Sequence, residues 1–114
     1  MLPAEHRLTD AATFRVATRR GRRCSTRELS LHLVEGGPAG DRPVRVGFVV
    51  SKAVGGSVVR NRVRRRLRHV LRAHLDELSQ GQVVVVRAFP AAAVASSAEL
   101  DAAVTHCLRR CTAA

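Results

Sequence analysis

Aromatic residues and lysines are scarce in this 114-residue chain, which has three phenylalanines and no tryptophan or tyrosine. Lys52 is the only lysine, yet Lys and Arg together number 20 against nine Asp and Glu residues, a net charge of +11. A GC-rich genome would explain arginine in place of lysine, but not this excess of cations. Arginine pairs with phosphate through two parallel hydrogen bonds and stacks on bases, so a nucleic acid is the favoured partner class.

Long apolar runs and paired cysteines are also absent. No apolar segment approaches the length that spans a membrane, and the N-terminus lacks the apolar core of a signal peptide, so we predict a cytoplasmic protein. The three cysteines include no CxxC pair. Cys107 and Cys111 lie four residues apart beside His106, but a zinc site would need two further ligands there. We expect both cysteines to be buried apolar residues.

Patterns that would build an active site are missing as well. The nine carboxylates are scattered, and no HExxH, ExxH or DxD pattern indicates a metal-dependent nuclease. The five histidines are isolated, and His74 falls on an apolar helix face, where packing is the expected role. The pairs Asp76-Glu77 and Glu99/Asp101 are expected to be solvated or to cap helix ends. The residues therefore predict a binding protein without an active site of its own.

Residues 57–78, SVVRNRVRRRLRHVLRAHLDEL, form the most regular segment. Aliphatic residues recur there at steps of three and four, the period of a helix with one buried face. These residues are Val59, Val63, Leu67, Val70, Leu71, Leu75 and Leu78. At about 100° per residue, the opposite face carries Asn61, Arg64, Arg65, Arg68 and Arg72, with Arg62 and Arg66 on its flank. The apolar face has no aromatic residue, which disfavours a membrane surface as partner.

The N-terminal third is expected to contain an arm and a short helix. Residues 1–8 are predicted to be an extended, flexible arm. Thr9 or Asp10 would cap a helix that runs to about residue 20 and ends at Gly21. Phe14 is the only aromatic residue of this helix. We expect it to anchor the helix to the core, to line the edge of an RNA-binding groove, or to do both.

Three segments have clear strand patterns. Residues 28–34 alternate between apolar and polar and predict a half-buried strand, and residues 44–50 predict a second. The run VVVVRA at 83–88 is typical of a strand covered on both faces. A further short strand is possible near residues 23–25, and a turn-rich loop is expected over residues 35–43.

Two serines are predicted to begin helices. Ser57 follows the glycine-containing link at residues 51–56 and is expected to cap the central helix. Ser96 and Glu99 form a capping box that starts the last helix. The resulting order, α-β-β-α-β-α with room for one more strand, predicts a single α+β domain over residues 1–114.

Three interpretations of the basic helix remain open at this point. An arginine-rich helix can enter the DNA major groove, but no helix-turn-helix precedes it and no zipper follows. A sheet beside a basic helix suits RNA better, because the sheet can hold a single strand while arginines grip a structured backbone. A merely solvated basic face would not explain why cations so outnumber anions.

Residues 52–68, KAVGGSVVRNRVRRRLR, closely resemble the RNR motif of the bacterial ribonuclease P protein family. The similarity extends along nearly the whole chain. It includes Arg7-Leu8, Phe14, Gly21, RVGFVVSK at 45–52, the valine strand with Arg87-Ala88, and SSAE at 96–99.

This resemblance implies an α-β-β-β-α-β-α sandwich whose β-α-β crossover is left-handed, against the usual preference. It implies a protein subunit that joins a catalytic RNA and assists the endonucleolytic removal of the 5′ leader from precursor tRNA. The expected partners are that RNA and precursor tRNA, with neither membrane nor DNA. Mg²⁺ is expected on the RNA, so the protein would hold no cofactor and no catalytic residue. The alternative is a general RNA-binding or ribosome-associated basic protein.

The resemblance also assigns roles by position in the motif. Contacts with the catalytic RNA fall to Lys52, Arg60, Asn61, Arg62, Arg64, Arg65 and Arg68. By helical angle, Arg60 leans toward the aliphatic side and is expected to help fix the helix start as well. The cleft for the leader would include Phe14, Arg15, Thr18, His32 and Phe48. Thr18 and His32 stand where many relatives have an aromatic residue, so leader contact is expected to depend more on charge and shape.

Overall fold

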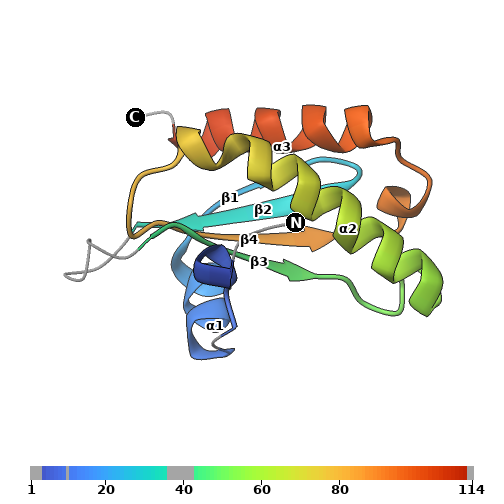
Figure 1. The fold of residues 1–114 in the computed structure, drawn as a ribbon, viewed down its shortest axis with the longest axis horizontal. Coiled ribbons are helices and arrows are strands. Elements are labelled where there is room, and N and C mark those ends of the chain that lie inside the picture. Colours follow the sequence, from blue (N-terminus) through green and yellow to red (C-terminus); the bar gives the residue numbers. More distant parts are fainter. Residues whose placement is uncertain (1–3, 10, 36–42, 113–114) are drawn as a thin grey trace.

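The computed structural model describes residues 4–9, 11–35 and 43–112 (Figure 1). The strands are β1 (Arg22–Ser25), β2 (Leu29–Val34), β3 (Arg45–Val49) and β4 (Val83–Ala88). The α-helices are α1 (Ala11–Arg20), α2 (Ser57–His74) and α3 (Ser97–Thr112), and the 3-10 helices are η1 (Ala4–His6), η2 (Leu75–Glu77) and η3 (Pro90–Ala93). The predicted α-β-β-β-α-β-α order, including the short strand near residue 23, is confirmed. Asp10 and most of the predicted 35–43 loop lie outside the described residues.

The four strands form one sheet in the order β1-β2-β4-β3. The pairs β1/β2 and β2/β4 are antiparallel, whereas β3 and β4 are parallel neighbours joined through α2. The predicted β-α-β crossover is therefore present, and its left hand stays a prediction. Helices α2 and α3 cover one face of the sheet and α1 lies on the other (Figure 1).

The hydrophobic core is divided by the sheet into a large and a small cluster. The large cluster joins β2 and β4 to α2 and α3, and its fully buried members include Leu29, Leu31, Leu33, Val63, Leu67, Leu71, Val84, Val86, Leu100 and Val104. The small cluster comprises Leu8, Ala17, Val83 and Val85, with Phe14 packed against it. Alternate valines of β4 thus face opposite clusters, which confirms that this strand is covered on both faces.

Strand β2 is more deeply buried than its alternating sequence predicts. The prediction of a half-buried strand is wrong, because Ser30 and His32 on the supposedly polar face are only 1% and 6% exposed. The physical reason is that α1 packs against this side of β2. The two side chains form a hydrogen bond with each other, with 3.4 Å between Ser30 Oγ and His32 Nε2.

The N-terminal segment is held along β3. The prediction of an extended, flexible arm over residues 1–8 is wrong for Ala4–Leu8, since Ala4–His6 form a 3-10 turn and Leu8 is buried. The Leu8 N–H donates to the Val46 carbonyl at 2.9 Å, and His6 Nδ1 lies 2.7 Å from the Val44 carbonyl oxygen. These contacts cover part of the otherwise open edge of β3, which stabilises it. Residues 1–3 lie outside the described residues.

Glycines rather than side-chain caps lie at the C-terminal end of α1 and at the start of α2. Gly21 ends α1 as predicted, and a Cβ at this position would lie 2.5 Å from the Ala17 carbonyl oxygen. Gly56 is the N-cap of α2, so the prediction of Ser57 as cap is wrong, and no side-chain cap bond forms. A Cβ at Gly55 would lie 2.9 Å from Val59 Cγ1. The chain therefore needs glycine where it turns into α2.

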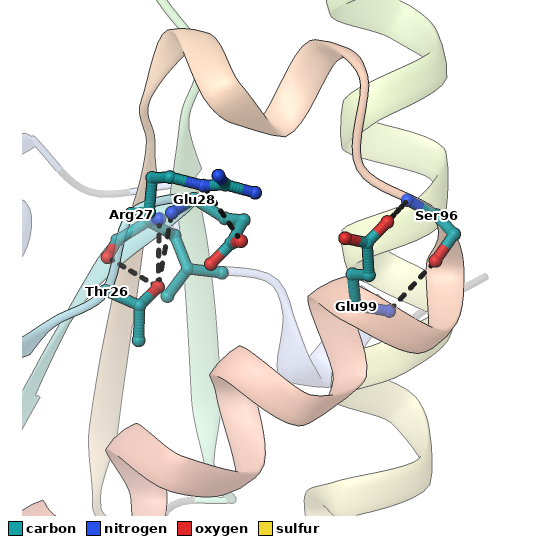
Figure 2. Close-up of polar contacts among 6 residues, drawn as sticks. Thr26, Arg27, Glu28, Ser96 and Glu99 are labelled. Atoms are coloured by element: carbon teal, nitrogen blue, oxygen red, sulfur yellow. Dashed lines mark hydrogen bonds and ion pairs between the residues drawn. The ribbon is translucent and has the colours of Figure 1, made fainter.

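Helix α3 begins with the predicted capping box, which Figure 2 shows. The Ser96 N–H donates to Glu99 Oε1 at 2.9 Å, and the Glu99 N–H donates to Ser96 Oγ at 3.1 Å. The hydrogen bond from the Ser96 backbone lowers the pKa of Glu99, because it favours the ionised carboxylate. In the part of the chain that the structure describes, no helix has the length and apolarity to cross a membrane.

Candidate nucleic-acid interface

Helix α2 lies with its aliphatic face on the sheet and leaves its arginines on two sides. Val63, Leu67, Val70 and Leu71 are buried against the large cluster, as the periodicity predicted. The regular α-helix ends at His74 and continues as the 3-10 turn η2. The observed α-helix is therefore shorter than the predicted helix over residues 57–78.

On one side, Arg64 and Arg68 line a cleft together with Phe14 and Phe48. Arg7, Leu8, Thr9, Val46 and Gly47 complete its walls. The cleft therefore lies where the N-terminal segment and α1 meet the β3 edge beside α2. Its combination of two rings and two guanidinium groups suits a single-stranded nucleic acid, whose bases stack and whose phosphates pair with arginine.

The predicted contact residues differ in how far they are exposed. Arg64 is half-buried and is held by its own helix and by the residue after β3: Nη1 donates to Asn61 Oδ1 at 3.3 Å, and Nη2 donates to the Val50 carbonyl at 3.4 Å. Arg65 and Asn61 are exposed, and Lys52 is exposed in the turn before the helix. Arg68, predicted to be fully exposed, is half-buried because it forms part of the cleft wall.

On the other side, two arginines hold α2 to the segment after β4. Arg62 Nη2 donates to the Ala93 carbonyl at 3.2 Å, and Arg66 Nη1 donates to the Ala95 carbonyl at 2.9 Å. Arg62 therefore has a structural partner within the chain that its place in the motif did not reveal. Arg60 is half-buried, in line with its predicted lean toward the aliphatic side, and its Nε has no hydrogen-bond partner among the described residues.

The charge of α2 is not neutralised within the chain. Among the described residues, no arginine of α2 forms an ion pair with a carboxylate. Several guanidinium groups of like sign on one helix repel one another and attract an external polyanion. Because these arginines pair with no described carboxylate, this attraction is available for binding.

The five residues predicted for the leader cleft are not brought together. Phe14 and Phe48 line the cleft, but Arg15 lies on the outer side of α1, in a separate depression with Val16 and Arg19. The Thr18 hydroxyl lies 3.1 Å from both the Phe14 and Arg15 carbonyl oxygens of its own helix, so it is occupied locally. Neither Arg15 nor Thr18 lines this cleft: Arg15 lies on the exposed side of α1, whereas Thr18 follows Phe14 by one helical turn and bonds to its own helix. Their contact with the leader stays a prediction.

His32 also lies outside the cleft wall, buried in β2 beneath α1. Burial lowers the pKa of His32, and the nearby charges of Arg23 and Arg87 lower it further. The neutral ring is therefore favoured. Its Nδ1 has no partner among the described residues, which is compatible with a neutral histidine packed between cations.

Gly47 is a cleft residue that the sequence reasoning missed. A Cβ at this position would lie 2.3 Å from Phe14 Cζ, so only glycine lets the ring lie directly on β3. The available signal was a glycine inside an otherwise apolar strand, which often marks the close approach of another group. Arg7 was noticed as part of the family pattern but not as a cleft residue.

A polar cluster at the end of α2 was also missed. His74 is buried, as predicted, but it is not merely packed: Nε2 lies 2.7 Å from Asp101 Oδ1, and Nδ1 bonds to Glu77 Oε2. Burial opposes the charged ring, yet the hydrogen bonds to Asp101 and Glu77 outweigh it and raise the pKa of His74. The prediction that Glu77 and Asp101 are only solvated or capping residues is wrong, since they hold this histidine.

The cysteines behave as predicted, as buried apolar residues. Cys107 and Cys111 belong to the large cluster, and burial raises the pKa of Cys107 to about 12. No group of three or more His, Cys, Asp or Glu residues within the described ranges could hold a metal ion. The chain offers basic side chains and a cleft, and these define a small basic α+β protein whose surface charge suits a polyanion.

Comparison with known proteins identifies the family to which this basic α+β protein belongs. Residues 2–112 match the family model described as Ribonuclease P. The ribonuclease P protein component of Nocardioides sp. is 56% identical over 110 residues, covering 96% of this chain and 94% of the relative. That of Streptomyces avermitilis is 47% identical over 116 residues, with the same coverage. The chain belongs to the ribonuclease P protein family.

Solved structures agree on the fold. The RNase P protein of Staphylococcus aureus superposes with a TM-score of 0.81 at 21% identity, covering 94% of this chain and 95% of that one. The RNase P protein of Thermotoga maritima gives a TM-score of 0.73 at 18% identity, covering 88% and 92%. Both likenesses support the α+β architecture predicted from the sequence.

Proposed function

We propose that this chain is the protein component of ribonuclease P, the endoribonuclease that hydrolyses one bond of precursor tRNA and releases the 5′ leader. The observation that carries the proposal is the cleft in which Arg64 and Arg68 of the RNR helix face Phe14 and Phe48. Close relatives that carry the same name support it along nearly the full length.

In this proposal, the exposed cations before and along α2 contact the phosphate backbone of the catalytic RNA. Lys52, Asn61 and Arg65 are the predicted contact residues that are exposed. The adjoining cleft receives the single-stranded leader, stacking it on two rings rather than on the larger aromatic set of many relatives. Because these exposed residues lie on or just before α2 and the cleft lies beside this helix, one protein contacts both the catalytic RNA and the leader of precursor tRNA.

The reaction itself is proposed to take place on the RNA subunit. Mg²⁺ held by that RNA would supply the chemistry of hydrolysis, while the residues of this chain bind and orient the two RNAs. The protein would act in the cytoplasm, where precursor tRNA is processed. No catalytic residue is assigned to the chain.

Reconstitution with the cognate RNA tests the proposal. Cleavage of precursor tRNA is measured across a Mg²⁺ titration, with and without the protein. We expect the protein to lower the Mg²⁺ requirement and to strengthen the binding of precursor tRNA. If the protein produces neither effect at any concentration, the proposed role is excluded.

The alternative is a general RNA-binding or ribosome-associated basic protein. Such a protein would bind precursor tRNA and mature tRNA with similar affinity, because it would not use the leader. A ribonuclease P component should prefer the substrate that carries a leader. Competition with duplex DNA at matched salt separates both from a DNA-binding protein.

A further inference from the structure

A second basic depression lies at the opposite edge of the sheet from the cleft. We call it the β1–α3 groove, because the edge strand β1 and the end of α3 form its two sides. Its lining comprises Arg22, Arg23, Cys24, Ser25, His106, Arg110 and Cys111. Neither the RNR helix nor the aromatic cleft contributes a residue to this groove.

The groove has cations and no carboxylate in its lining. Arg23 and Arg110 are exposed, and neither forms an ion pair within the described residues. Arg22 differs from them, since its Nη1 donates to the Cys111 carbonyl at 2.8 Å and so holds the last turn of α3. The groove therefore combines one fixed guanidinium with two whose charge is unpaired.

A purely structural role explains only part of this charge. Arginine near the C-terminal end of a helix is favourable, because the last carbonyls carry partial negative charge. This accounts for Arg110, and Arg22 is explained by its carbonyl contact. A charged side chain on the edge strand, such as Arg23, also discourages pairing with another chain. However, three arginines in one groove repel one another, which costs stability unless an anion is bound.

The chemistry of the lining favours a phosphate backbone over a protein partner. Stable protein interfaces are centred on buried aromatic or large apolar side chains, and this groove has none. Arginine and serine side chains are the groups that bind phosphate oxygens in nucleic-acid complexes. A basic depression with these groups suits the phosphate backbone of a folded RNA.

We propose that the β1–α3 groove is a second RNA-binding site, in which Arg23 and Arg110 pair with backbone phosphates. The inference rests on the proposed function, because it supposes that the RNA partners are the catalytic RNA and precursor tRNA. With basic surfaces at both edges of the sheet, the protein contacts RNA on two sides. The phosphates belong either to the catalytic RNA or to precursor tRNA, and the two experiments below distinguish these RNAs.

The first experiment compares RNA affinity at several salt concentrations for the wild type and for Arg23→Ala/Arg110→Ala. Catalytic RNA and precursor tRNA are titrated separately. Losing two phosphate contacts should reduce the slope of log K against log salt by about two units and weaken binding of one RNA by about tenfold. Arg23→Lys/Arg110→Lys should restore most of the affinity, since the charges return.

Arg27→Ala is the matched control at the same edge of the sheet. Arg27 lies in the turn after β1 and pairs with Glu28 at 3.7 Å (Figure 2), so it is outside the groove and already has a carboxylate partner. Its removal should leave RNA affinity and salt slope nearly unchanged. Thermal unfolding of each variant shows whether a lost affinity comes from lost folding.

The second experiment uses Cys24 as a reporter inside the groove. Cys24 is partly exposed, whereas Cys107 and Cys111 are buried, so iodoacetamide should modify Cys24 first. Bound RNA that occupies the groove should slow this modification, as followed by peptide mass spectrometry. The RNA that gives protection, catalytic RNA or precursor tRNA, is the one that lies in the groove.

The outcomes separate this inference from the proposed function. If the wild type binds neither RNA, the proposed function itself fails. If the wild type binds both, but the double variant keeps its affinity and salt slope and RNA leaves Cys24 unprotected, only the second site is refuted. Stronger protection by polyglutamate than by RNA at matched salt would instead identify an acidic protein as the partner and overturn the proposal.

Discussion

The two sides of helix α2 use arginine for different purposes. Toward the segment after β4, Arg62 and Arg66 donate to the Ala93 and Ala95 carbonyls and hold the helix in place. Toward the cleft, Arg64 and Arg68 line a cavity that opens to solvent. Residue type is the same on both sides, so position decides whether an arginine only holds the fold or, like Arg64, both contacts a carbonyl and lines the cleft.

The holding side continues to the end of the helix. Arg62, Arg66 and His74 follow one another along α2, and all three contact the part of the chain after β4. We call these three residues the tethering row. Each contacts a partner that follows β4 in the chain: Ala93, Ala95 and Asp101 in turn. The row therefore holds α2 against the segment after β4 and the start of α3.

The largest expected effect comes from the core beneath both sides. Leu67 is fully buried between the tethering row and the cleft arginines. Leu67→Ala should lower the free energy of unfolding by about 2–5 kcal/mol, because it removes buried methyl groups and leaves a cavity. Urea unfolding measures the change. Val58→Ala is the control, since Val58 is 78% exposed and its truncation should alter stability by less than about 0.5 kcal/mol.

Breaking the tethering row alone should have the next largest effect on stability. Arg62→Ala/Arg66→Ala removes two charged donors and the packing of their aliphatic stems, so the free energy of unfolding should fall by about 1–3 kcal/mol. Chemical unfolding gives the number. An unchanged stability would show that these two carbonyl contacts do not hold α2.

The histidine of the tethering row should make stability depend on pH. The pKa of His74 is raised above its ordinary 6.5, so its contribution is fully present below pH 6.5 and is lost as pH rises through the raised value. Asp101 and Glu77 are half-exposed, and solvent screening limits the effect to about 1 kcal/mol.

The test is the difference in stability between the wild type and His74→Gln, measured from pH 5 to pH 9. The difference isolates His74 from His32, whose lowered pKa has the opposite sign and favours folding above pH 6.5. The advantage of the wild type should shrink as pH rises. A difference that is flat with pH would contradict the charged pairing.

The cleft side should show the smallest change in stability and a clear change in binding. Arg65 is exposed, so Arg65→Ala should alter the free energy of unfolding by less than about 0.5 kcal/mol. It should reduce the salt slope of RNA binding by about one unit. Arg68→Ala should reduce binding similarly, with a larger cost in stability because Arg68 is half-buried. A marked fall in melting temperature for Arg65→Ala would place this residue with the tethering row.

Local sequence determined the elements whose signals lie within a few residues. The helical period of α2, the all-valine strand β4 and the Ser96–Glu99 capping box were each predicted and are each present. These patterns are reliable because helix period, strand burial and capping depend on neighbours within one or two turns. The RNR motif likewise identified the family from consecutive residues.

Tertiary structure alone decided the features that depend on distant partners. The tethering contacts of Arg62 and His74 reach 31 and 27 residues along the chain, and the N-terminal segment reaches 38 residues to β3. No local pattern encodes which carbonyl or carboxylate will lie opposite a side chain. The sequence therefore determined that α2 is a basic amphipathic helix of this family. Packing against the neighbouring elements decided which of its arginines hold the fold and which stay exposed to solvent.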